Sequence, residues 1–304
     1  KMKKKFAFPT VLLFAFFLAS CGGSPPPTEA PPPDAPPPPA EEAPTVPPEE
    51  PTAEPEPTAL PEPDFDPQPP DGQRVEFEAS DGTALVGYYY PASIPNAPVV
   101  VLMHWAGGDQ NDWIKNGMID WLQNRGTTHG VNSPSRQSVI YPPMPEGASF
   151  AVFTFDFREF GESGGSFNQA GGLLDAQAAY EKAKMLEGID PTRMAGVGSS
   201  IGADGVVDGC AEGCLGALSL SPGSYLTVPY TDAVKTLDDA GKPVNCVASE
   251  GDTTSANTCK EAAGENYQSF VYPGNEHGDE YYQNPPEGFG QMIFDWLALV
   301  FEML

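Results

Sequence analysis

From residue 97 onward, the chain alternates between short apolar stretches and longer stretches in which apolar residues have helical spacing. The clearest apolar stretch is Ala97–Met103, which reads APVVVLM and contains no polar side chain. Such a run is typical of a strand buried on both faces of a parallel sheet. Strands that alternate with helices predict a doubly wound α/β fold, with a mainly parallel sheet, helices on both faces and functional residues at the carboxyl ends of the strands.

The boundaries of the other elements follow from the same patterns. A hairpin over 74–79 and 84–90 precedes the alternating region, because a turn-like Ser-Asp-Gly tripeptide separates its strands. Two segments without a clear pattern, 126–147 and 222–241, have about 20 residues each, so we expect no separate cap domain and an open site. The remaining predicted strands are 150–155, 194–197, 215–220, 244–249 and 268–272, and the predicted helices are 111–124, 173–186, 201 onward, 255–264 and 288–304.

The first 21 residues have the features of a bacterial lipoprotein signal. Lysines at positions 3, 4 and 5 precede an apolar run over 6–19, which is shorter than the roughly 20 residues needed to cross a bilayer. The run ends in Leu-Ala-Ser-Cys at 18–21, which resembles the lipobox, where the cysteine becomes the lipid-bearing N-terminus after cleavage. We therefore expect a signal peptide over 1–20 and an exported protein, anchored through lipid on Cys21 to the outer face of the cytoplasmic membrane or to the outer membrane.

The segment after the signal is rich in proline and in acidic residues. Of the 36 prolines, 21 lie within 22–71, together with 12 of the 42 acidic residues and no Lys or Arg. With almost no apolar side chain to bury, such a segment cannot offset the entropy lost on ordering. We therefore expect 21–72 to be a lipidated cysteine followed by a disordered tether, which holds a folded domain over 73–304 away from the membrane.

The folded domain is strongly acidic. Residues 73–304 carry 11 Lys and Arg against 30 Asp and Glu, which is a formal charge of −19. Such a surface repels phosphate backbones, and the chain offers no basic stripe, so the charge argues against nucleic acid as a partner. The same charge favours small neutral or cationic substrates over anionic ones.

A G-x-S-x-G pattern at 198–202, which reads GSSIG, lies between a predicted strand and a predicted helix. In that context the pattern is typical of a nucleophile elbow, a sharp turn that exposes a serine hydroxyl at the edge of the sheet. A dinucleotide-binding G-x-G-x-x-G is the competing interpretation, because Gly196 and Gly198 also follow the strand. Its third glycine would fall on position 201, which is Ile201. We therefore expect Ser200 to be a nucleophile.

A serine nucleophile needs a base to accept its proton, and the chain has 3 histidines. His129 lies in a polar loop upstream of the serine, and His104 ends a buried strand, where it is better placed to shape a loop than to transfer protons. His277 follows the last predicted strand, from which a loop can bring it over the sheet edge toward Ser200. The sequence therefore predicts that His277 acts as general base and then as general acid.

The acid that orients the histidine is expected between Ser200 and His277 in chain order. Two carboxylates fit, because Glu250 and Asp252 both follow the predicted strand 244–249. We favour Asp252, since it lies just past the strand end, where the loop can turn it toward the histidine. Glu250 remains the alternative acid.

A tetrahedral intermediate also needs backbone N–H donors. Ile201 follows the nucleophile at the start of a predicted helix and should supply one donor. The other should come from Trp105 or Ala106 in the loop after strand 97–103, where two following glycines permit a tight turn. The sequence does not decide between these two residues.

Together these motifs resemble the α/β-hydrolase superfamily over about 74–304, closest to the dienelactone-hydrolase-like and small esterase branch. The segment 155–163, FDFREFGES, resembles the family's D-x-R-G-x-G-x-S loop. The resemblance implies hydrolysis of carboxylic esters or related acyl bonds through an acyl-enzyme, without a cofactor. Two departures bear on the site: Glu159 stands where the family usually has glycine, and Trp105 replaces the glycine after the histidine of its H-G-x-x-G loop.

Besides the lipidation cysteine, four cysteines remain, an even number in a domain expected to be exported, where disulfides can form. Three pairings are possible. Local spacing favours Cys210 with Cys214 and Cys246 with Cys259, and the second bridge would stiffen the segment that carries Asp252. A metal site is the alternative, but C-x₃-C without nearby histidines is weak evidence, and we expect no metal.

The sequence therefore predicts an exported, lipid-anchored and monomeric serine hydrolase, most simply a carboxylic ester hydrolase with the triad Ser200, His277 and Asp252. A serine peptidase or amidase on the same fold is an alternative within enzymes. A non-catalytic binding module of the same fold is an alternative from another class, and a missing triad member would favour it.

Overall fold

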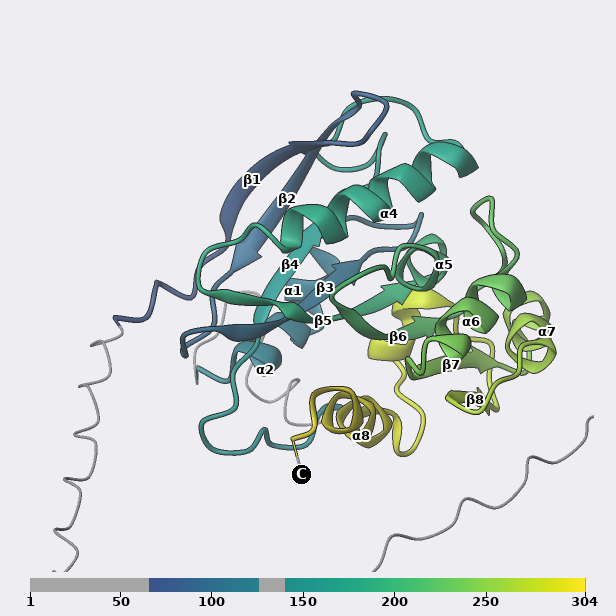
Figure 1. Cartoon of the computed structure of the whole chain (residues 1–304). Helices are drawn as coiled ribbons and strands as arrows, with labels where there is room; N and C mark the ends of the chain where they lie inside the picture. The colour runs from purple at the N-terminus through teal and green to yellow at the C-terminus, as the bar shows by residue number, and fades with distance from the viewer. Residues whose placement is uncertain (1–65, 126–139, 304) are drawn as a thin grey trace, which may run out of the picture. The chain divides into compact units, whose positions relative to one another are not determined.

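The computed structural model describes residues 66–125 and 140–303, and its centre is one sheet (Figure 1). Its eight strands lie in the order β1-β2-β4-β3-β5-β6-β7-β8. The first two are antiparallel to their neighbours, whereas the other six are parallel to one another, which confirms the predicted hairpin and the mainly parallel sheet. The strands are β1 (Gln73–Glu78), β2 (Ala84–Tyr90), β3 (Ala97–Met103), β4 (Ala151–Phe155), β5 (Ile189–Ser199), β6 (Cys214–Leu220), β7 (Val244–Ser249) and β8 (Tyr267–Tyr272).

Helices cover both faces of the sheet, as predicted (Figure 1). Because successive side chains of a strand point to opposite faces, Val99 and Val101 of β3 belong to one apolar core, whereas Val100 and Leu102 belong to the other. The first core includes α4 (Gln169–Ala183), α5 (Ile201–Asp208), α6 (Tyr230–Asp239) and α7 (Thr253–Glu261). The second includes α1 (Asp112–Lys115), α2 (Met118–Gln123), the 3₁₀ helix η1 (Gly278–Tyr282) and α8 (Phe289–Phe301).

The structure corrects the prediction in two places. The helix predicted over 111–124 is two short helices, α1 and α2, because Gly117 between them has φ 81°, a left-handed conformation that interrupts the helical path. The segment 222–241, which showed no clear pattern, contains α6. Its apolar face consists of Tyr230, Val234 and Leu237, which are spaced by one helical turn and buried against the sheet.

Several predictions concern residues outside the described ranges. The signal peptide, Cys21 and the predicted tether up to residue 65 lie within 1–65, and His129 lies within 126–139. Within the described ranges, no helix combines the length and the apolar character needed to cross a membrane.

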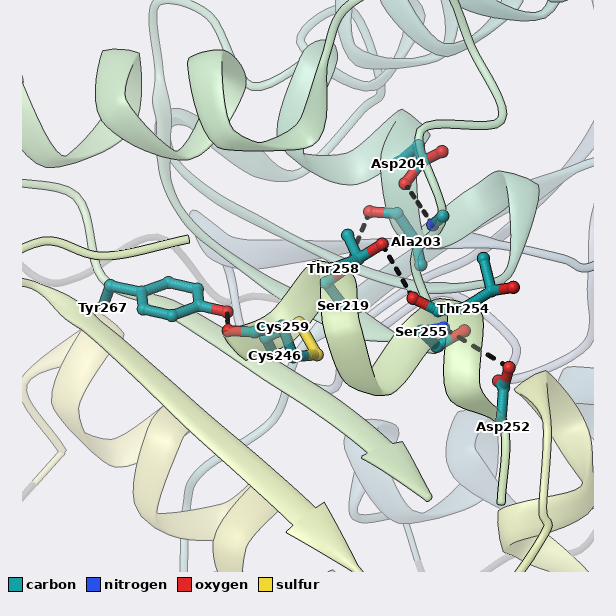
Figure 2. The surroundings of a disulfide bond; sticks show 11 residues. Ala203, Asp204, Ser219, Cys246, Asp252, Thr254, Ser255, Thr258, Cys259 and Tyr267 are labelled. Atoms are coloured by element: carbon teal, nitrogen blue, oxygen red, sulfur yellow. Dashed lines mark hydrogen bonds between the residues drawn. A yellow bond between two sulfur atoms is a disulfide. The ribbon is translucent and has the colours of Figure 1, made fainter. Parts of the chain in front are cut away.

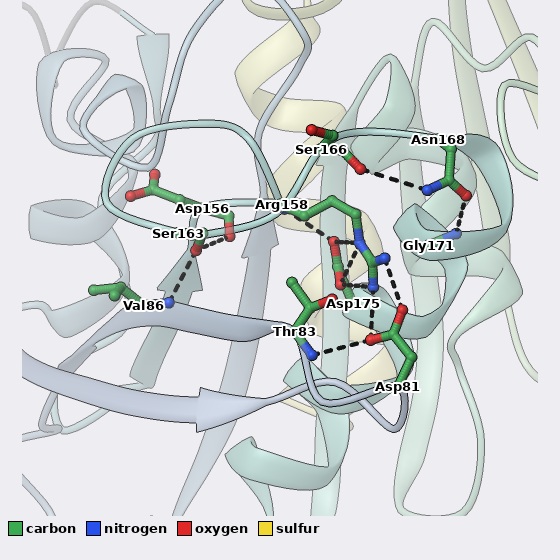
Figure 3. Close-up of polar contacts among 10 residues, drawn as sticks. All are labelled: Asp81, Thr83, Val86, Asp156, Arg158, Ser163, Ser166, Asn168, Gly171 and Asp175. Atoms are coloured by element: carbon green, nitrogen blue, oxygen red, sulfur yellow. Dashed lines mark hydrogen bonds and ion pairs between the residues drawn. The ribbon is translucent and has the colours of Figure 1, made fainter.

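A buried arginine joins the loop after β4 to two other parts of the chain (Figure 3). The side chain of Arg158 is 5% exposed, and that of Asp175 on α4 is fully buried. The guanidinium donates hydrogen bonds to both oxygens of Asp175 at 2.8–3.1 Å, and it also contacts Asp81 in the β1–β2 turn at 2.8 Å. Glu159, in the same loop, has φ 77°. A glutamate therefore adopts a left-handed backbone conformation at this position.

The last residue of α5, Asp208, is an acid whose carboxylate has no hydrogen-bond partner among the described residues. Both carboxylate oxygens of Asp208 are buried, and none of the described residues donates a hydrogen bond to them. Burial, and to a smaller extent the neighbouring charge of Asp204, raises the pKa of Asp208 to about 8. The folded protein therefore holds a proton on this carboxyl at neutral pH.

We expect Asp208→Asn to gain roughly 1–4 kcal/mol of stability relative to the wild type between pH 5 and pH 8, because the amide does not titrate and each unit of pKa difference is worth about 1.4 kcal/mol. Between its ordinary pKa of 3.8 and about 8, the folded chain keeps a proton that the unfolded chain has released. The wild type therefore loses stability as pH rises through this window, whereas the asparagine variant does not. Urea unfolding at pH 5 and pH 8 measures the difference, and equal stabilisation at both pH values would contradict it.

Candidate active site

Ser200 lies at the junction between β5 and α5, and its backbone has φ 54° and ψ −113°. The glycines of the motif are required by close packing. A Cβ on Gly198 would lie 2.0 Å from the carbonyl oxygen of Gly202, and a Cβ on Gly202 would lie 2.2 Å from that of Met103. The strand therefore turns sharply into a helix that passes directly over β3, as a nucleophile elbow requires.

Three residues from separate strand ends form a chain of hydrogen bonds. His277 Nε2 lies 2.9 Å from Ser200 Oγ, and His277 Nδ1 lies 2.7 Å from Asp252 Oδ2. If the proton of the neutral ring is on Nδ1 and donated to Asp252, the lone pair of Nε2 faces the serine hydroxyl. The side chain of His277 is 30% exposed and that of Asp252 is 12% exposed, so the histidine is open to a substrate while the acid is largely covered.

Asp252 also caps the N-terminus of α7 (Figure 2). Its Oδ1 accepts a hydrogen bond from the backbone N–H of Ser255 at 3.4 Å. Burial alone would raise the pKa of Asp252, but the hydrogen bonds from Ser255 and His277 outweigh it and hold the pKa below its usual value. Glu250, the alternative acid, is exposed, and its backbone N–H donates to Tyr272 O at 2.8 Å. The geometry therefore brings Asp252 to the histidine, and Glu250 has no such contact.

Both predicted disulfides are present. Cys210 and Cys214 have Cα atoms 5.3 Å apart and connect the segment after α5 to the start of β6. Cys246 of β7 and Cys259 of α7 have Cα atoms 5.6 Å apart and enclose Asp252 between them in sequence (Figure 2). The cysteines that could have suggested a metal are thus paired with one another, and no group of three potential metal ligands occurs among residues 66–125 and 140–303.

The ring of His104 is bonded to backbone groups, and among the described residues it makes no hydrogen bond to Ser200. The residue is 1% exposed. Its Nδ1 donates to the carbonyl oxygen of Trp105 at 2.7 Å, and its Nε2 accepts from the backbone N–H of Phe157 at 3.0 Å. Burial lowers the pKa of His104. With both ring nitrogens engaged, the imidazole stays neutral and holds the loop after β3, as its place at the strand end predicts.

The predicted oxyanion donors lie at neighbouring strand ends. Ile201 is the first residue of α5, where backbone N–H groups lack partners within the helix. Trp105 and Ala106 follow β3, which pairs with β5 up to Met103 and Gly198. The Trp105 indole donates to Asp112 Oδ2 at 3.1 Å, and a Cβ on Gly278 would lie 3.2 Å from its ring. Trp105 therefore packs against the loop that carries the histidine.

Sequence reasoning missed the role of Asp204 in this region. Asp204 lies in the first turn of α5, is 1% exposed, and accepts backbone N–H groups of Gly223 and Tyr225 in the loop after β6. Burial raises the pKa of Asp204 to about 6, although these hydrogen bonds oppose it. The loop that it holds places the Tyr225 ring 6.3 Å from the His277 ring, edge to face. The signal in the sequence was an acid in the first turn of α5, among residues 201–207 that are otherwise apolar or glycine.

Solved structures resemble this chain over most of its described length. The Pyrococcus furiosus esterase Pf2001 aligns with a TM-score of 0.56 at 17% identity, covering 75% of this chain and 90% of that protein. The α/β-hydrolase GrgF from a Penicillium species aligns with a TM-score of 0.53 at 13% identity, covering 75% of this chain and 98% of that protein. This chain has the α/β-hydrolase fold.

Comparison of sequences gives a more limited result. The uncharacterised protein YfhR of Escherichia coli K12 is 30% identical over 147 residues, which are 48% of this chain and 44% of that protein. The match thus spans less than half the length of this relative. No protein-family model matches the chain. The α/β-hydrolase fold is therefore established by structure, while the dienelactone-hydrolase-like branch stays a prediction.

Proposed function

We propose that this protein is a serine hydrolase of carboxylic esters, exported and anchored to the cell envelope through lipid on Cys21. The observation that carries the proposal is the hydrogen-bonded series Ser200, His277 and Asp252 on an α/β-hydrolase fold. The predicted tether would hold the domain at a distance from the membrane. The formal charge of −19 over residues 73–304 supports small neutral or cationic esters as substrates.

In the proposed reaction, Ser200 Oγ attacks the ester carbonyl while His277 Nε2 accepts the hydroxyl proton. Asp252 stabilises the imidazolium that forms. Backbone N–H groups of Ile201 and of Trp105 or Ala106 stabilise the oxyanion. His277 then donates its proton to the departing alcohol, which leaves an acyl-enzyme. Water, activated by the same histidine, hydrolyses this intermediate and regenerates Ser200, so the cycle needs no cofactor.

A fluorophosphonate probe tests the serine mechanism. We expect it to label the wild type and Ser199→Ala but not Ser200→Ala. Ser199 is a matched control, because it adjoins Ser200, is 1% exposed, and no described residue makes a hydrogen bond to its Oγ. Hydrolysis of short p-nitrophenyl esters should fall with the labelling. Equal labelling of the wild type and Ser200→Ala would reject the serine mechanism, and no labelling of any variant would indicate a binding module. In the substrate comparison, faster turnover of aminoacyl amides than of esters would indicate a peptidase.

A further inference from the structure

Three buried hydroxyl groups lie beneath the loop that carries His277. Ser221 follows β6, Ser249 ends β7 and Tyr281 lies in η1, and all three residues are fully buried. The hydroxyl of Tyr281 lies 3.0 Å from Ser249 Oγ, and the side chain of Ser221 interacts with the same hydroxyl. We call this group the hydroxyl chain. None of its members makes a hydrogen bond to Ser200 or to the imidazole of His277 among the contacts of the described residues.

The hydroxyl chain makes hydrogen bonds to the two residues that flank His277, to the backbone of one and to the side chain of the other. The N–H of Gly278, which follows the histidine, donates to Ser221 Oγ at 3.1 Å. Ser249 Oγ donates to a carboxylate oxygen of Glu276, which precedes the histidine, at 3.3 Å. Ser221 thus holds the residue after the histidine, and Ser249, which is bonded to Tyr281, holds the residue before it. Because the one hydroxyl proton of Ser249 is donated to Glu276, the hydroxyl of Tyr281 donates to Ser249.

The backbone around this contact is in an uncommon conformation. Ser221 has φ 59° and Gly278 has φ 58°, both in the left-handed region. That conformation carries a cost for serine, and it persists only where the surroundings determine it. Here the N–H of Ser221 donates to Val247 O at 2.8 Å while its side chain accepts from Gly278. The unusual backbone thus turns the hydroxyl of Ser221 toward the histidine loop.

We propose that the hydroxyl chain of Ser221, Tyr281 and Ser249 positions His277 between Ser200 and Asp252. The inference rests on the proposed function, since it assumes that His277 is the general base. Glu276 and Gly278 are both held by these hydrogen bonds, so the backbone at His277 can shift only a little without breaking a buried hydrogen bond. A displacement of about 1 Å at a reacting group costs on the order of 100-fold in rate. The members of the chain are therefore positioning residues.

Tyr281→Phe tests the proposal, with Tyr282→Phe as its control. Both tyrosines are fully buried in η1, but Tyr282 has no hydrogen-bond partner for its hydroxyl among the described residues. We expect Tyr281→Phe to lower kcat toward p-nitrophenyl esters about 10- to 100-fold with KM nearly unchanged, and Tyr282→Phe to retain wild-type kcat. We also expect the downfield proton resonance of His277 Nδ1–H to broaden or shift in Tyr281→Phe alone.

A second pair of variants keeps the test decisive if Tyr281→Phe does not fold. Ser221→Gly removes the acceptor of Gly278 and tolerates the left-handed backbone. Ser224→Gly is its control, because Ser224 has φ 54° in the same loop and its Oγ accepts from the N–H of Tyr230, away from the histidine. Wild-type kcat and an unchanged resonance in Tyr281→Phe and Ser221→Gly would overturn the proposal. If Ser200→Ala kept its activity, the proposed function would fail, and the resonance would still decide whether the chain orients His277.

Discussion

Replacing Asp252 by asparagine should lower kcat by about 10³- to 10⁴-fold, whereas Glu250→Gln should leave it close to the wild-type value. Asp252 accepts a hydrogen bond from His277 Nδ1 at 2.7 Å, while Glu250 is exposed and does not contact the histidine. An asparagine amide can donate to Nδ1, which favours the tautomer with its proton on Nε2. In that tautomer the ring cannot accept the proton of Ser200.

The asparagine variant should fold normally, which makes its loss of turnover informative. Asp252 caps α7 through the N–H of Ser255, and asparagine is an equally good capping residue. The Cys246–Cys259 bridge also holds this segment in place. Steady-state kinetics with a p-nitrophenyl ester, together with thermal unfolding of both variants, measures the effect. A large loss in Glu250→Gln with near-normal turnover in Asp252→Asn would assign the acid to Glu250.

The sequence could predict which residues come together at the site, because residues that follow parallel strands meet at one edge of the sheet. Ser200 and His277 were identified in this way, from a motif in its context and from the small number of histidines. The choice of Asp252 over Glu250 rested on one extra step, the distance past the strand end. The structure supplies the physical reason for it, since Glu250 is still paired to Tyr272 by its backbone, and the chain turns only after it.

Contacts between distant segments were beyond sequence reasoning. Ser221, Ser249 and Tyr281 are ordinary residues in their local sequence, and only the fold brings their hydroxyls together. The same holds for the break between α1 and α2, where one glycine in the left-handed region overrides the helical spacing around it. Helix α6 was missed because its apolar positions are few and are mixed with acidic and threonine residues.

Arg158 illustrates how a single residue in an acidic domain can be essential to the fold. It is the one Lys or Arg that is buried among residues 66–125 and 140–303. We expect Arg158→Met to destabilise the domain by about 3–5 kcal/mol, because it leaves the carboxylate of Asp175 buried without its partner. Exposed Arg74, which is paired with Glu76 and Glu162, is the matched control. Arg74→Met should have a much smaller effect, because solvent screens its ion pairs.

The double variant Arg158→Met with Asp175→Leu distinguishes the loss of the ion pair from the cost of a buried carboxylate left without a partner. If the uncompensated carboxylate is the main cost, removing it should recover much of the lost stability, because an apolar pair of similar volume can replace a buried ion pair. The single variant should also be less destabilised toward pH 4, where Asp175 takes up a proton and becomes neutral. Urea unfolding at pH 4 and pH 7 measures both effects. A double variant as unstable as Arg158→Met would show instead that the hydrogen bonds of Arg158 to Asp81 and its own packing carry the stability.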